Sequence, residues 1–315
     1  MKNYTSVSPL FSSLNENQSF LKNYLIYTCI SVEGQTDIIN GYSKTVFDTI
    51  TGNSLPLGIA VNPLGSRVYV SNAVGGSVTV INTEDNSIET TITVGTSPRQ
   101  LKVNPEGTKL YVVSQGGNSI SIINTATNIV TNVVLVGLGP TGMTFTRDGT
   151  KAYIMNSTAG SVSVINTSTE TVSTTITGFS NPLAADCNAD SSFVYVVNQG
   201  TAQIRIIDTS TDTVDSNITV GGSPLSIAIN RSSTKAYVGH NGTVPLNIID
   251  LPSNNVTNTV TISSNARDLT VTPDDKKVYI AHDNASLLTE LDAINESVKN
   301  TITTGNSPTG VVVKP

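Results

Sequence analysis

The chain has 315 residues, of which 37% are hydrophobic and 13% are charged, and its formal net charge is −6. The charged fraction is about half of the usual ~25%, and the chain as a whole lacks the basic footprint of most nucleic-acid-binding proteins. No apolar run approaches the roughly 18 residues of a membrane-spanning helix. We therefore expect neither nucleic-acid binding nor membrane insertion.

The first 22 residues, MKNYTSVSPLFSSLNENQSFLK, do not share the pattern of the rest of the chain. They contain no continuous apolar segment followed by a small-residue cleavage site, so we do not predict a secretory signal peptide. The tetrapeptide SLNE, Ser13 to Glu16, is typical of a capping box at the start of a short helix. We treat residues 1–22 as a tail, either a docking segment or a frayed terminus, and residues 23–315 as one domain.

Residues 23–315 are built from a repeated unit of 42 residues. A proline recurs at one phase of this unit, with Ala266 in its place once: Pro56, Pro98, Pro140, Pro182, Pro224 and Pro308. A tyrosine recurs at a second phase: Tyr27, Tyr69, Tyr111, Tyr153, Tyr195, Tyr237 and Tyr279. We interpret these tyrosines as structural, with each ring packed between neighbouring units and each hydroxyl bonded to backbone.

Each unit predicts short strands and no helix. Three strands come first in the chain: YLIYTCIS (24–31), TDIIN (36–40) and VFDTITG (46–52). Complete units then predict four strands each, as in RQLKVN (99–104), LYVVS (110–114), SISIIN (119–124) and NVVLVG (132–137). β-Branched and aromatic residues fill these runs, and Gly, Asn, Asp and Pro separate them. Four strands in about 42 residues, repeated, indicate a β-propeller blade.

The two ends of the chain predict how the propeller closes. The last unit supplies one strand only, TGVVVKP (309–315), and the first supplies the three strands that this unit lacks. We expect these four strands to form one composite blade, because pairing them removes two exposed sheet edges. The predicted fold is therefore all-β, a seven-bladed β-propeller of four-stranded blades.

Two units show a resemblance to a known family. SRVYVSNAVGGSVTVINTEDNSIETTITVGTSP (66–98) and SFVYVVNQGTAQIRIIDTSTDTVDSNITVGGSP (192–224) resemble the YVTN-type, WD40-like β-propeller repeat. That family includes archaeal surface-layer proteins and bacterial secreted or periplasmic proteins, and the similarity extends over nearly the whole chain. The resemblance implies a seven-bladed ring with binding sites near its central channel. It does not choose between scaffolds, adhesion modules and enzymes.

The only two histidines, His240 and His282, occupy the same position in consecutive units, where three other units carry asparagine. We expect them on the face where the innermost strands begin, near Arg267, Asp268 and Asp283. Such a cluster is able to bind a divalent metal, bind an anion, or serve acid–base catalysis. The alternative is that each histidine replaces asparagine as a hydrogen-bonding loop residue. No metal-binding spacing such as HExxH is present.

Positions lining the predicted channel also differ between units. Arg99 and Arg267 stand at equivalent places on different sides of the ring, where an anion could lie between them. Lys102 and Asp186 each require a partner. Cys187 occupies a position that is otherwise apolar, so we expect a buried thiol there, and we expect Cys29 to be free as well.

The opposite face carries a cation at the start of the second strand of five units: Arg67, Lys109, Lys151, Lys235 and Lys277. Acidic residues in the adjacent turns offset these cations, and the recurring tyrosines are not placed to stack on bases. The basic residues therefore do not alter the expectation that nucleic acid is not a partner.

The sequence favours a non-catalytic binding or scaffold propeller at the cell surface or outside the cell, with a cytoplasmic location as the alternative because no signal peptide is visible. We expect a monomer that binds a protein or a small molecule, without a cofactor or metal. The candidate ligand-binding residues are His240, His282, Arg267, Asp268, Asp283 and Arg99. The alternative function is a small-molecule-binding or lyase- or lactonase-like enzyme with its pocket beside His240, His282 and Arg267.

Overall fold

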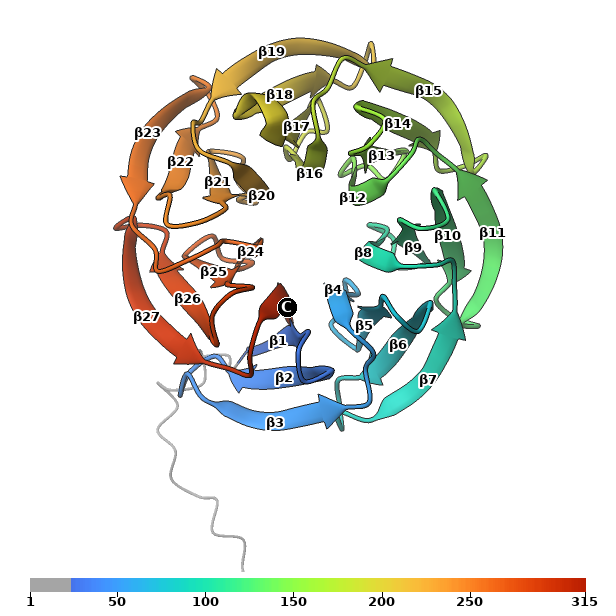
Figure 1. The fold of residues 1–315 in the computed structure, drawn as a ribbon, viewed down its shortest axis with the longest axis vertical. Helices are drawn as coiled ribbons and strands as arrows, with labels where there is room; N and C mark the ends of the chain where they lie inside the picture. The colour runs from blue at the N-terminus through green and yellow to red at the C-terminus, as the bar shows by residue number, and fades with distance from the viewer. Residues whose placement is uncertain (1–23) are drawn as a thin grey trace, which may run out of the picture.

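The computed structural model describes residues 24–315, which form seven four-stranded antiparallel sheets arranged as blades around a central axis (Figure 1). The predicted seven-bladed fold is confirmed. The predicted tail, residues 1–22, lies outside the described residues. No helix in the described part of the chain has the length and apolar character needed to cross a membrane.

The strands are grouped here by their place in the blade. The innermost strands are β4 (Pro56–Val61), β8 (Pro98–Val103), β12 (Pro140–Phe145), β16 (Pro182–Cys187), β20 (Pro224–Ile229), β24 (Asp268–Val271) and β28 (Pro308–Val313). The second strands are β1 (Leu25–Ile30), β5 (Arg67–Asn72), β9 (Lys109–Ser114), β13 (Lys151–Asn156), β17 (Phe193–Asn198), β21 (Lys235–His240) and β25 (Lys277–Ala281). The third strands are β2 (Gln35–Asn40), β6 (Ser77–Asn82), β10 (Ser119–Asn124), β14 (Ser161–Asn166), β18 (Gln203–Asp208), β22 (Leu246–Asp250) and β26 (Leu287–Asp292). The outermost strands are β3 (Val46–Thr51), β7 (Ile88–Thr93), β11 (Ile129–Leu135), β15 (Thr171–Thr177), β19 (Thr213–Thr219), β23 (Asn255–Val260) and β27 (Ser297–Thr303). A short 3₁₀ turn, η2, covers Gln199–Thr201.

The composite blade forms as predicted, in the order β28-β1-β2-β3 (Figure 1). The C-terminal strand β28 pairs antiparallel with β1, with Ile26 opposite Val313 and Cys29 opposite Gly310. The two ends of the described chain thus complete one sheet.

Burial within a blade explains its composition. The second and third strands are buried along nearly their whole length, as in β9 and β10. Outermost strands such as β11 consist mainly of exposed and half-buried residues. β11 begins at Ile129, three residues before the predicted start, because a register shift opposite Ile122 and Ile123 lets the pairing continue past Thr131. The Thr131 hydroxyl donates to the Ile122 carbonyl at this bulge (3.2 Å).

The recurring tyrosines are buried as predicted, but the predicted hydroxyl contact is wrong. Three of the seven hydroxyls bond to a side chain of the next blade, in the turn before its outermost strand, and none bonds to backbone. Tyr279 donates to Glu290 of its own blade, and the remaining hydroxyls have no hydrogen-bond partner among the described residues: Tyr69, Tyr111 and Tyr237. Tyr27 donates to Asn86 Oδ1 (2.9 Å) and Tyr195 to Asn254 Oδ1 (3.3 Å). These turn residues have a left-handed backbone, with φ of 59° at Asn86, which asparagine tolerates well. Each such tyrosine therefore connects two blades.

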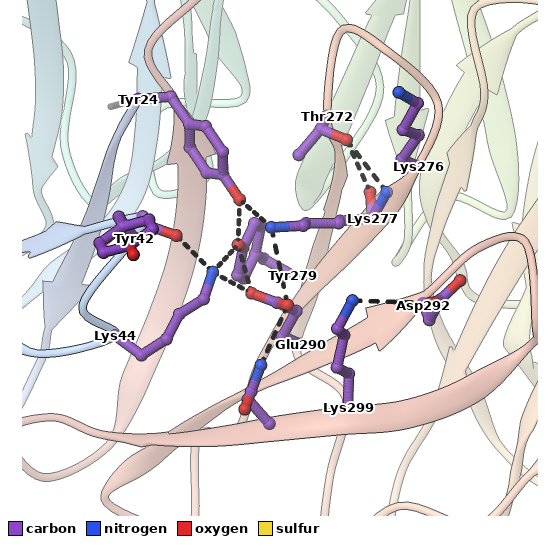
Figure 2. A network of polar contacts seen from close by, with 12 residues as sticks. Tyr24, Tyr42, Lys44, Thr272, Lys276, Lys277, Tyr279, Glu290, Asp292 and Lys299 are labelled. Carbon is purple, nitrogen blue, oxygen red and sulfur yellow. Dashed lines mark hydrogen bonds and ion pairs between the residues drawn. The ribbon is translucent and has the colours of Figure 1, made fainter. Parts of the chain in front are cut away.

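A lysine at the start of the second strand makes a second contact between neighbouring blades. Lys109 binds Glu170 (2.6 Å) and Lys235 binds Glu296 (2.5 Å), in each case at that same turn position of the next blade. At the seam between β25 and the composite blade the equivalent pair would be Lys277 with Lys44, two like charges. A different network is found there (Figure 2).

Glu290 on β26 compensates for this reversal of charge. It is fully buried at a position where the other blades carry Val or Ile. Its carboxylate binds the Lys44 ammonium, lies 3.7 Å from Lys277 Nζ and accepts from the Tyr279 hydroxyl (2.6 Å) (Figure 2). Burial favours a raised pKa at Glu290, but the contacts with Lys44 and Tyr279 hold that pKa below its usual value. Tyr24 completes the network, 2.5 Å from the Tyr279 hydroxyl and 2.9 Å from Lys277 Nζ.

We predict that Glu290→Ile lowers the free energy of unfolding by roughly 2–3 kcal/mol, because it leaves two ammonium groups without their shared carboxylate. Adding Lys44→Glu should restore most of this loss, because the seam then has the apolar residue and the Lys–Glu pair found between β21 and the neighbouring blade. Urea unfolding of wild type, both single variants and the double variant gives the coupling energy. Additive losses would contradict the compensating role of Glu290.

Candidate functional site

The seven innermost strands surround a channel with a cavity volume of about 610 Å³. Every innermost strand contributes to its lining, and turns at both ends of the ring extend it. One mouth, here called the loop-side mouth, lies where the innermost strands begin. The residues that directly follow the recurring proline, or Ala266 in its place, form a ring of seven that lines the cavity: Leu57, Arg99, Thr141, Leu183, Leu225, Arg267 and Thr309.

The channel carries more positive than negative side chains. Its charged lining residues are five cations and two carboxylates: Arg99, Lys102, Arg147, Arg231, Arg267, Asp186 and Asp268. The whole chain has the opposite sign, with a net charge of −6. Positive charge is therefore concentrated inside the ring, and a cleft lined by one sign of charge attracts ions of the other.

Both channel carboxylates are engaged in structural hydrogen bonds. Asp268 accepts from the Val311 backbone N–H of the neighbouring innermost strand (3.0 Å). Asp186 accepts from the Ile229 N–H of its own neighbour (2.9 Å) and pairs with Arg147 (3.2 Å). These carboxylates tie adjacent innermost strands together, which leaves them less able to neutralise the other cations.

The two arginines at the loop-side mouth have weaker partners. Arg99 Nε donates to the neutral Gln115 Oε1 (2.5 Å), and among the described residues no carboxylate lies within ion-pair distance of Arg99. Arg267 Nε lies 3.8 Å from Asp283 Oδ2, a long contact. Burial, and secondarily the nearby charge of Arg267, lower the pKa of Arg99. Both guanidinium groups line the same cavity from blades on different sides of the ring, so an anion inside the mouth would be attracted by both.

The six residues predicted from the sequence separate into two groups. Arg99, Arg267 and Asp268 line the channel, and Asp283 lies behind Arg267, where it also accepts from Asn265 (2.9 Å). The predicted convergence of the histidines on these residues is wrong, because both imidazoles are fully buried inside their blades: His240 and His282. A ligand-binding role for the channel residues stays a prediction.

The histidines make the contacts of the asparagines that they replace. His240 Nε2 lies 2.5 Å from Asn247 Oδ1, and His282 Nε2 lies 2.8 Å from Thr289 Oγ1, seven residues further in each case. Asn156 Nδ2 donates to Ser163 Oγ over the same spacing (2.9 Å). The sequence therefore predicted correctly that the two histidines occupy equivalent positions in neighbouring blades. Their side chains, however, are buried inside the blades and do not line the channel.

Two further chemical possibilities are tested by the geometry. Within residues 24–315 no group of three or more His, Cys, Asp or Glu side chains is placed to hold a metal ion. Cys29 and Cys187 are free and buried, as expected. Burial raises the pKa of Cys187 to about 12, which keeps it in the unreactive thiol form at neutral pH.

Arg147 and Arg231 were missed by the sequence analysis. Both lie in turns at the far end of the channel, in the mouth opposite the arginine pair. The repeat did carry a signal for them, since four other units have proline at that position: Pro63, Pro105, Pro273 and Pro315. Comparing the turns, and not only the strands, would have identified them.

Known proteins agree with this architecture. The family described as "Lactonase, 7-bladed beta-propeller" matches residues 39–133. No curated protein matches the chain by sequence.

Solved structures show the fold. The chain is similar to a protein from Desulfotomaculum acetoxidans of unknown function, with a TM-score of 0.82 and 14% identity over 92% of this chain and 98% of that one. It is similar to a Bacteroides uniformis protein provisionally assigned as a 6-phosphogluconolactonase, with a TM-score of 0.78 and 11% identity over 93% and 100% of the two chains. It is also similar to the Kuenenia stuttgartiensis hydrazine synthase, with a TM-score of 0.75 and 19% identity over 81% of this chain and 88% of that one.

The buried histidines generate a prediction about acid stability. Burial lowers the pKa of His240 and of His282 below the ordinary value, which is about 6.5 in an unfolded chain. The unfolded state therefore binds protons first as the pH falls, and the free energy of unfolding decreases below about pH 6.5. His240→Asn with His282→Asn should lose less stability between pH 7.5 and 5.5 than wild type, as measured by urea unfolding. Equal losses in both proteins would show that the histidines do not contribute.

Proposed function

We propose that this protein is a binding propeller whose central channel takes a small anionic ligand at the loop-side mouth, between Arg99 and Arg267. The observation that carries this proposal is the excess of cations in the channel of an acidic protein. The channel carboxylates are committed to backbone amides, whereas Arg99 has only a neutral side-chain partner. Guanidinium groups bind carboxylate and phosphate oxygens through paired N–H donors.

Anion binding is tested by calorimetric titration with acetate, phosphate and sulfate at low salt. Each arginine contributes charge-assisted hydrogen bonds of about 1.5–3 kcal/mol, so Arg99→Gln and Arg267→Gln should each weaken binding at least tenfold. Lys299→Gln is the matched control, because it removes one positive charge from outermost strand β27. Equal affinity in all four proteins, or no binding to wild type, would contradict the proposal.

The second candidate function is lactone hydrolysis. It is favoured by the family match over residues 39–133 and by Asp268, a carboxyl group in the channel next to Arg267. Burial raises the pKa of Asp268 despite its contacts with the Val311 and Leu269 amides and the charges of Lys102 and Arg267. A raised pKa suits a general base that activates water. Water would add to the lactone carbonyl, the ring C–O bond would break, and the arginines would bind the carboxylate of the resulting hydroxy acid.

An assay of the hydrolysis of simple γ- and δ-lactones, with proton release as the measured signal, separates the binding function from the enzymatic one. An enzyme should lose at least about a hundredfold in rate on Asp268→Asn. The asparagine retains an oxygen to accept from the Val311 N–H, so the fold should persist. Hydrolysis by wild type at the buffer rate, with anion binding intact, would leave the binding propeller as the function.

A further inference from the structure

The ring of residues at the loop-side mouth is not uniformly polar. Three of its seven members are leucines that line the cavity and are only half-buried: Leu57, Leu183 and Leu225. Leu183 and Leu225 stand on neighbouring blades, on strands β16 and β20, and are consecutive around the ring. They occupy the arc between Thr141 and Arg267. Leu225 is therefore next to Arg267 on the ring, and Leu57 is next to Arg99.

The hydroxyls of the two threonines on the ring are already bonded. Thr141 donates to the Leu183 carbonyl (3.1 Å), and Thr309 donates to the Pro56 carbonyl (3.0 Å). The free recognition elements of the mouth are consequently the two guanidinium groups and the leucine side chains. A sugar or another polyhydroxylated ligand would find few unused hydrogen-bonding groups on this ring, whereas an apolar chain would cover the leucines.

The charges at the mouth favour a single negative charge on the ligand. Asp268 lies one residue below Arg267 in the channel, and Asp283 lies behind it at 3.8 Å. These carboxylates reduce the attraction for a second negative charge close to Arg267. A doubly charged phosphate monoester is thus less well matched than a carboxylate, whose two oxygens fit one guanidinium fork.

We infer that the ligand of this channel is an amphipathic monocarboxylate, with its acid group between Arg99 and Arg267 and its aliphatic chain on Leu183 and Leu225. This inference rests on the proposed anion-binding function and names the class of anion. It adds apolar contact as the source of specificity, since each buried methylene strengthens binding roughly two- to fourfold.

The test is a calorimetric titration of the full chain with acetate, butyrate, hexanoate and octanoate at constant ionic strength. The dissociation constant should fall roughly two- to fourfold per methylene until the chain outgrows the leucine arc. The controls are 1-hexanol and hexylammonium, which carry the same chain without a negative charge and should bind at least tenfold more weakly than hexanoate.

Two variants separate the contributions of charge and chain. Leu183→Ser with Leu225→Ser should flatten the dependence of affinity on chain length, so that octanoate loses much more affinity than acetate. Arg99→Gln should weaken the whole series by a similar factor. The wild-type series alone decides the inference even if the leucine variant does not fold.

The outcomes distinguish the two levels of the proposal. Affinity that does not change from acetate to octanoate would overturn the amphipathic ligand and keep anion binding. Absence of binding by every carboxylate, with phosphate or sulfate still bound, would overturn the inference alone, and absence of binding by all of these anions would overturn both. Tight binding of 1-hexanol, equal to that of hexanoate, would show an apolar site that does not use the arginines, and would also overturn the inference.

Discussion

The pairing of β28 with β1 is the contact on which the rest of the structure depends. It joins positions 282 residues apart, as where the Thr28 hydroxyl donates to the Gly310 carbonyl (2.8 Å). Only a closed ring gives every blade two neighbours, and the hydrophobic clusters lie between blades: one combines Ile206 of β18 with Ile227 of β20. Chain entropy opposes such a long-range contact only logarithmically, and closure removes two sheet edges. The unusual network at Glu290 stabilises the seam that this closure creates.

Close packing of the innermost strands determines which channel groups are free. A side chain at Gly58 or Gly142 would collide with the backbone of the next innermost strand, so glycine allows the strands to approach there. Polar residues at the same position bond to the next unit instead: Gln100 accepts from the Met143 N–H (2.5 Å), and Ser226 donates to the Ala266 carbonyl (2.7 Å). Asp268 accepts in the same way as Gln100. The contacts that hold the innermost strands together thus engage both channel carboxylates, and the proposed anion binding rests on the cations that these carboxylates leave without a close partner.

The sequence predicted the blades well because a strict period constrains every unit at once. The tyrosines, the closing strand and the burial of Cys187 all follow from position within the unit. The histidines were misplaced because the period gives a place on the ring but not the direction of the side chain. The register shift opposite His240, between Pro224 and Ser226, recurs in other blades, and the asparagine at the equivalent place, such as Asn156, is buried as His240 is. Arg147 and Arg231 lie in turns, where the repeat is least regular.

The contrast between a cationic channel and an acidic exterior has a kinetic consequence. At distances beyond the mouth an approaching anion meets the net charge of −6, and it meets the arginines only within the last few ångströms. At 0.1 M salt the Debye length is about 10 Å. Salt therefore screens the long-range repulsion between the anion and the acidic protein before it screens the attraction inside the mouth. Added salt would then speed the encounter of ligand and protein while it shortens the lifetime of the complex. For the proposed anionic ligand, association and dissociation rates would both rise with ionic strength, unlike those of proteins whose whole surface steers the ligand inward.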